Sequence, residues 1–188
     1  APDRKPPVIL REFRVHDGSM KHSLFQYPVN AIEGTIVQEG DKFLLNMKGL
    51  GSGHEGVLTG VVQLTDGDFD ADLRIQTPQG LPVDDTLIEA FDTPKLKAIA
   101  ATLRALQIRS GYGDVDVSFR KVASKGPKFL TFLKADLKDC EINYDRFPMK
   151  LTGVSGHIEH DPTRGNVWHF QDLHGMRGEA TVTGNGQY

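Results

Sequence analysis

Hydrophobic and polar side chains alternate along most of this chain. The alternation is clearest in residues 68–75, 114–120, 133–138 and 140–145. A period of two places successive side chains on opposite faces of a β-strand. Strands with one apolar and one wet face are typical of an antiparallel sheet that is solvated on one side. The pattern therefore predicts a mainly β protein, with about ten strands in a curved or twisted antiparallel sheet.

One region breaks this period and predicts a short two-helix insert at about residues 84–108. Asp84 and Asp85 form a suitable N-cap for a first helix over residues 86–91. Pro94 stands at or near the start of a second helix, where its missing N–H costs little. Apolar residues then follow at helical spacing on one face: Leu96, Ile99, Ala100, Leu103 and Leu106.

Two stretches of the chain resemble one another. An aromatic-Pro pair, a strand and a glycine occur in residues 27–36 and again in residues 147–158. The match resumes between residues 60–64 and 184–188. Such a repeat indicates a stacked scaffold in which the repeated positions specify the fold. The fold-specifying positions predicted in this way are Pro28, Gly34, Pro148 and Gly156.

The repeat also predicts the domain organisation. We expect a single repeat-built domain over residues 1–188, with a first copy at about 8–64, an insert at about 65–134 and a second copy at about 135–188. The second copy stops at the position equivalent to Leu64, which favours a piece excised from a longer chain. The alternative is a natural C-terminus at that point.

The predicted helices are too short to cover the predicted sheet. They would be ~12 and ~18 Å long, whereas ten strands span ~45 Å. The sheet must curl, pack as two layers, or leave an exposed apolar groove that is suited to binding an apolar ligand. The residues predicted to line such a groove are Phe69, Leu73, Ile75, Val117, Phe119, Leu137 and Ile142.

Composition excludes several function classes. The net charge is −3 and the basic residues are scattered, so no electrostatic footprint for nucleic acid is present. No apolar run is long enough to span a bilayer as a helix. The single cysteine, Cys140, excludes an internal disulfide and a cysteine-based metal site.

Two motifs suggest chemistry that their context does not support. Residues 51–56 match G-x-G-x-x-G, but a strand follows where a dinucleotide site needs a helix, so we interpret them as a hairpin turn. Residues 66–70 resemble the start of a calcium loop, but Ala71 and Thr77 replace the required Gly and Glu. We interpret these acids as residues on the solvent-exposed face of a strand. The alternative is a loose calcium site at the surface.

No catalytic signature or cofactor motif is present, and we predict no enzymatic activity, cofactor or metal. His157, Glu159 and His169 are weak candidates for a zinc site, because two share a strand face and the third could lie on the partner strand. Solvent-facing histidines are the favoured interpretation. A catalytic site assembled from dispersed residues stays open as an alternative.

The repeated unit resembles segments of AsmA-like and TamB-like bacterial envelope proteins. The resemblance rests on residues 27–34 and 147–156, on the later Thr-Gly pairs at 59–60 and 183–184, and on residues 81–87. It implies a β-groove in the periplasm that handles phospholipid or supports outer-membrane assembly. It also implies neighbouring repeats as partners and an inner-membrane anchor in a part of the chain not present here.

The alternative function is a purely structural β-module of a large surface or envelope protein. In that case the apolar face is sealed as an ordinary core and binds no ligand. A groove wall and a sheet core have the same period of two, so the pattern alone leaves both open.

Overall fold

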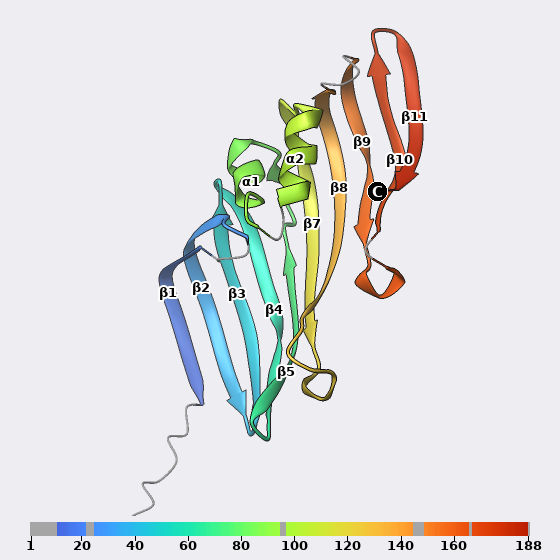
Figure 1. Cartoon of the computed structure of the whole chain (residues 1–188). Helices are drawn as coiled ribbons and strands as arrows, with labels where there is room; N and C mark the ends of the chain where they lie inside the picture. The colour runs from blue at the N-terminus through green and yellow to red at the C-terminus, as the bar shows by residue number, and fades with distance from the viewer. Residues whose placement is uncertain (1–10, 22–24, 95–96, 145–148, 166, 188) are drawn as a thin grey trace, which may run out of the picture.

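The computed structural model describes residues 11–21, 25–94, 97–144, 149–165 and 167–187. These residues form one open antiparallel sheet of eleven strands, with two helices on one face (Figure 1). The strands are β1 (Glu12–Lys21), β2 (Pro28–Glu39), β3 (Lys42–Gly51), β4 (His54–Thr65), β5 (Asp68–Gln76), β6 (Leu81–Pro82), β7 (Ser110–Lys121), β8 (Leu130–Asn143), β9 (Lys150–His160), β10 (Trp168–Arg177) and β11 (Ala180–Gln187).

The strands follow one another across the sheet in chain order, and only the two-residue strand β6 lies off this path, beside β7. The predicted antiparallel sheet is therefore confirmed. The predicted hairpin at residues 51–56 is also present, because Gly51 pairs with His54 at the end of β3 and β4. Ser52 and Gly53 close this turn with φ of 47° and 80°, positive values that suit a tight hairpin.

The predicted helical insert is confirmed as α1 (Asp85–Ala90) and α2 (Lys97–Leu106). The Asp84 side chain caps α1 by accepting a hydrogen bond from the Leu87 N–H at 2.9 Å. Short 3₁₀ turns, η1 (Ala123–Lys125) and η2 (Pro162–Arg164), follow β7 and β9. Neither α1 nor α2, as described, is long and apolar enough to cross a membrane.

The buried core lies where the helical insert covers the sheet. Only ten hydrophobic residues in the described part of the chain are buried. The Gln26 N–H donates to the Ala90 carbonyl at 3.0 Å, which ties the segment before β2 to α1. The core cluster consists of Tyr27, Leu81, Val83, Leu87, Ala90, Cys140 and Val154. This small cluster stabilises one end of a wide sheet, and no other element in the described part of the chain covers the rest of the apolar face.

Glycines within the strands make room for large side chains from neighbouring strands. Gly60 has a φ of 153°, and a Cβ there would lie 2.3 Å from the Asp72 carbonyl oxygen. The Leu73 side chain packs over the backbone of Gly60, since a Cβ at Gly60 would lie 3.0 Å from Leu73 Cδ2. Gly34 and Gly156 adopt nearly the same conformation, with φ of 152° and 151°.

The shared glycine geometry is relevant to the predicted repeat. Three residues before each of these glycines, Ala31 and Gly153 also have positive φ, at 48° and 57°. The correspondence does not extend along the whole unit, because Gly60 has a positive φ and Gly184 does not. The predicted position Pro148 lies outside the described residues. The two-copy origin of the sheet therefore stays a prediction.

Candidate functional site

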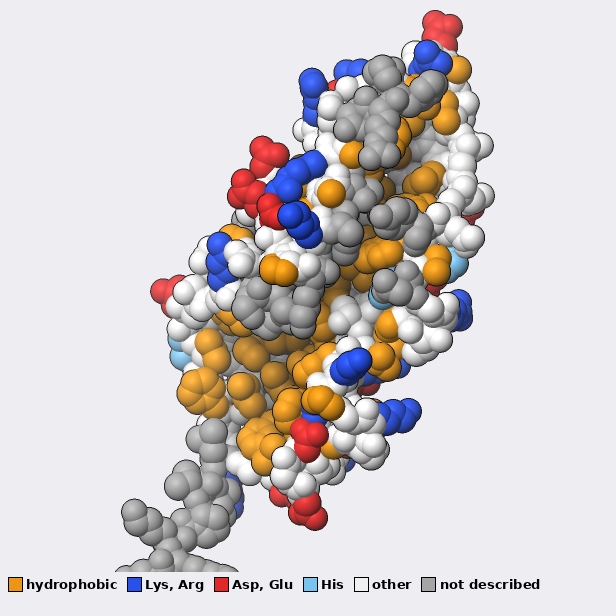
Figure 2. Space-filling view, viewed as in Figure 1, with side chains coloured by type: hydrophobic (Ala, Val, Ile, Leu, Met, Phe, Trp, Pro, Cys, Tyr) orange, Lys and Arg blue, Asp and Glu red, His pale blue; other side chains and the backbone are white. Residues whose placement is uncertain are grey.

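The apolar side chains of the central strands form a continuous surface on the face that carries the helices. Strand register places Gly60, Leu73 and Phe119 in one row across β4, β5 and β7, and Leu58, Ile75 and Val117 in the next. We call this surface the open apolar face; it consists of Phe43, Leu45, Met47, Leu58, Val62, Phe69, Leu73, Ile75, Val117 and Phe119. Figure 2 shows hydrophobic side chains gathered over the strands below the helices.

Every residue of the open apolar face is partly exposed, and none belongs to the buried core. A side chain sandwiched between two layers would instead be almost completely buried. Among the described residues, this face is therefore the uncovered side of a single sheet, and contiguous exposed apolar surfaces of this size are a common feature of interaction surfaces and ligand grooves.

The structure divides the seven predicted groove residues into two groups. Five of them, on β5 and β7, lie on the open apolar face, where Leu73 is paired with Phe119 and Ile75 with Val117. Leu137 and Ile142 lie on the same side of the sheet but pack against the core cluster beneath the helices. Phe43, Leu45 and Met47 on β3 belong to the same face, and they were not among the predicted groove residues. Their alternation on β3 was the available signal.

A buried cation at the end of the open apolar face was missed by sequence reasoning. Lys121 is only 4% exposed, and its Nζ lies 2.5 Å from Asp68 Oδ1 and 2.9 Å from the Phe69 carbonyl oxygen. The ammonium also lies 4.1 Å from the centre of the Phe69 ring, a cation–π contact. The hydrogen bond from Lys121 lowers the pKa of Asp68. The only signal in the sequence was a lysine at an apolar-face position of β7.

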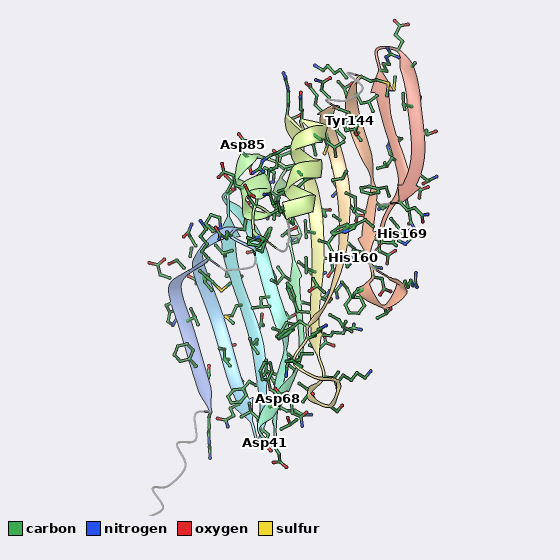
Figure 3. The ribbon with its side chains drawn as sticks, viewed as in Figure 1. Asp41, Asp68, Asp85, Tyr144, His160 and His169 are labelled. Atoms are coloured by element: carbon green, nitrogen blue, oxygen red, sulfur yellow. The ribbon has the colours of Figure 1, made fainter. Side chains whose placement is uncertain are left out.

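Two of the three acids of residues 66–70, Asp68 and Asp70, bind groups of the protein itself. Asp68 holds Lys121, and Asp70 accepts a hydrogen bond from the Ala123 N–H at 2.7 Å. Figure 3 places Asp68 at the lower end of the sheet, far from the helices. These contacts join the start of β5 to the turn that follows β7.

The three weak metal candidates lie on the charged face of the sheet, and the structure does not bring them together as ligands. The His157 Nδ1 lies 2.5 Å from Asp136 Oδ1, on the neighbouring strand β8. His169 is paired in register with Glu159, and Glu159 faces Lys134 Nζ at 3.5 Å. Within the described ranges, no three His, Cys, Asp or Glu side chains are grouped as metal ligands.

The other face of the sheet carries rows of paired charges. Ion pairs link neighbouring strands at Arg120–Asp72, Lys134–Glu159 and Lys150–Glu141, with N–O distances of 3.5, 3.5 and 3.0 Å. The Arg74 guanidinium donates to both carboxylate oxygens of Asp116, with Nε at 2.9 and 3.1 Å from them. This contrast between charged and apolar faces orients the sheet toward water on one side.

The Arg74–Asp116 pair predicts a small acid-dependent loss of stability. Hydrogen bonds from Arg74 hold the pKa of Asp116 below its ordinary value. A lowered folded-state pKa adds stability above the unfolded pKa of about 4, and this stability is lost as the pH falls through the folded value. Because Arg74 is half exposed, we expect no more than about 1 kcal/mol. The Asp116→Asn variant should therefore show a flatter dependence of Tm on pH below about 4.

The matched control for that measurement is Asp72→Asn. The Asp72 carboxylate is 65% exposed and lies 3.5 Å from Arg120 Nε, so its removal should change the pH dependence less. Equal pH profiles for wild type and Asp116→Asn would show that the pair contributes nothing to acid stability.

Comparison of the chain with protein-family models, with curated proteins and with solved structures finds no match.

Proposed function

We propose that this chain is a non-enzymatic segment of a large cell-envelope protein of the AsmA type, in which the open apolar face binds phospholipid acyl chains. One observation carries the proposal. Large apolar side chains of four adjacent strands lie together on one face, partly exposed, while the described helices cover only one end of that face. The predicted periplasmic location, the inner-membrane anchor and the neighbouring repeats belong to the same proposal.

The chemistry of the face favours an extended hydrocarbon ligand. The rows of Leu58, Leu73 and Phe119 offer apolar contact but no set of convergent polar groups that would recognise a compact polar ligand. Covering about 300 Å² of such surface would contribute about 7 kcal/mol, before the costs of association. Acyl chains lying across several strands would supply this coverage.

A non-enzymatic role is supported by the state of the single thiol. Cys140 is fully buried in the core cluster, and burial raises the pKa of its thiol. A buried thiol of this kind behaves as a small hydrophobic side chain and is a poor nucleophile.

The proposal predicts that phospholipid accompanies the protein through purification. The protein should be produced in bacteria, purified without detergent and examined by native mass spectrometry. We expect a bound species whose added mass is that of phospholipid, with the lipid identified after solvent extraction. A monodisperse, lipid-free protein that also fails to take up phospholipid from vesicles would contradict the proposal.

The second candidate is a structural β-module with a sealed core. It is favoured by the helical insert, which covers Leu137 and Ile142 as an ordinary core would. A lipid-free protein whose open apolar face is protected from solvent by a further protein layer would support this alternative.

A further inference from the structure

A hollow beside the charged face of the sheet forms a second candidate site, separate from the open apolar face. Its volume of about 370 Å³ is in the range of small-molecule sites. Strand register places Tyr112 and Asp114 on the same face as Asp116, which pairs with Arg74. The strands β4, β7 and β8 each lie between two other strands, so the hollow belongs to the interior of the sheet. Its lining residues are His54, Pro78, Gln79, Tyr112, Asp114 and Lys138.

One wall of the hollow is a firmly held turn after β5. The Gly80 N–H donates to the Thr77 carbonyl at 3.0 Å, which closes a β-turn with Pro78 at its second position, where proline is favoured. Thr77 is buried and fastens this turn to β7. Its N–H donates to the Val115 carbonyl at 3.0 Å, and its hydroxyl accepts from the Val115 N–H at 2.8 Å. The positions of Pro78 and Gln79 are therefore fixed before any ligand binds.

The second wall is aromatic. Tyr112 is 47% exposed, although the neighbouring positions of β7 on this face are polar. The His54 ring lies with its centre 5.8 Å from that of Tyr112, and the two ring planes are inclined by 53°. The face of such a ring is electron-rich and attracts the C–H groups of a ligand that stacks on it. The two rings thus provide an apolar platform within a polar surface.

Polar groups stand beside this platform. The Asp114 carboxylate forms an ion pair with the Lys138 ammonium. The turn packs against the same carboxylate, since a Cβ at Gly80 would lie 3.0 Å from Asp114 Oδ1. A carboxylate accepts up to about four hydrogen bonds and an ammonium donates three, so both groups can bond a ligand while they hold one another. Their charges cancel, which favours a neutral ligand with hydroxyl groups over an anion or a cation.

We infer that this hollow binds a neutral saccharide, with one pyranose ring stacked on Tyr112 and its hydroxyl groups bonded to Asp114 and Lys138. A pyranose whose hydroxyls are equatorial has apolar C–H faces and a polar rim, which match the aromatic platform and the ion pair. A nucleotide could stack in the same way, but its phosphate would be repelled by the Asp114 carboxylate. An acyl chain would leave the ion pair without a use. The site is therefore independent of the lipid-binding proposal.

The test is a titration of the whole chain with neutral oligosaccharides, followed by amide NMR spectra. The probes are cellotetraose, maltotetraose and chitotetraose. At least one should shift the amide signals of residues 54, 79, 80, 112–114 and 138. The Tyr112→Ala variant should bind that probe at least about tenfold more weakly, because the stacking surface is lost. The Tyr112→Phe variant keeps the ring and should keep most of the affinity.

The matched control is Tyr144→Ala, which removes an exposed tyrosine outside the hollow and should leave saccharide affinity unchanged. Inorganic phosphate is the charged probe and should not shift the signals of the hollow. Circular dichroism verifies that the variants fold; if Tyr112→Ala does not, the signals shifted in the wild type decide. The inference would be overturned if no probe binds at millimolar concentration, if the shifts lie elsewhere, if Tyr112→Ala binds as wild type does, or if phosphate binds more tightly than the saccharides.

Discussion

Replacing Tyr27 with alanine should destabilise the protein by about 3–5 kcal/mol, a loss typical of a large buried aromatic side chain. The Tyr27 ring is 5% exposed and stacks on Phe25 with ring centres 5.8 Å apart. Gly51 packs directly against the ring, since a Cβ there would lie 2.4 Å from Tyr27 Cε1. Because domains of this size are stable by only about 5–15 kcal/mol and this core is small, the loss should separate the helices from the sheet.

The matched variant Tyr27→Phe isolates the hydroxyl group. Tyr27 Oη is buried without a well-formed hydrogen bond within the described residues; burial raises the pKa of this hydroxyl, and the nearby Ser52 side chain offsets only part of that rise. Removing a buried polar atom that lacks a well-formed hydrogen bond should leave stability unchanged or increase it. Urea denaturation of both variants gives the two changes in unfolding free energy. A phenylalanine variant as unstable as the alanine variant would show that the hydroxyl makes a contact important for the fold.

Replacing Leu73 or Phe119 with aspartate should abolish phospholipid binding, with at least about a 100-fold loss of affinity, while the protein stays folded. A carboxylate beneath an acyl chain would lose its hydration without gaining a partner, which costs several kcal/mol. Both native side chains are partly exposed, so the aspartate can stay hydrated when no lipid is bound. Binding is measured with a fluorescent phospholipid analogue in a detergent-free titration.

The control for this pair is Thr59→Asp, which adds the same charge to the exposed charged face of β4. It should bind the analogue as wild type does. If Leu73→Asp and Phe119→Asp unfold the protein and Thr59→Asp does not, the apolar face is a sealed core and the structural alternative is favoured.

The period of two was sufficient to predict the strands, because it reports the face on which each side chain lies. It could not report what lies above that face. Leu137 and Phe119 have the same pattern in the sequence, yet only Leu137 is packed against the core beneath the helices. That difference depends on where the insert docks, through contacts such as Gln26 to Ala90 that connect residues far apart in the chain.

Strand bulges were the other feature that the pattern could not resolve. The apolar positions around Leu137 and Cys140 change phase within the single strand β8, because Asp139 adopts a φ of 51° and adds one residue to the pairing. The burial and the ion pair of Lys121 could not be predicted for a similar reason, since its partner Asp68 lies 53 positions away in the sequence. Local propensity contains no information about such a distant partner.

The most direct test of a lipid-binding face is photocrosslinking with a phospholipid that carries a diazirine in its acyl chain. After irradiation, proteolysis and mass spectrometry locate the modified residues. The proposal predicts crosslinks on the open apolar face of β3, β4, β5 and β7, and their loss in Leu73→Asp but not in Thr59→Asp. Crosslinks distributed equally over both faces of the sheet, or none above the level of an unfolded control, would contradict it.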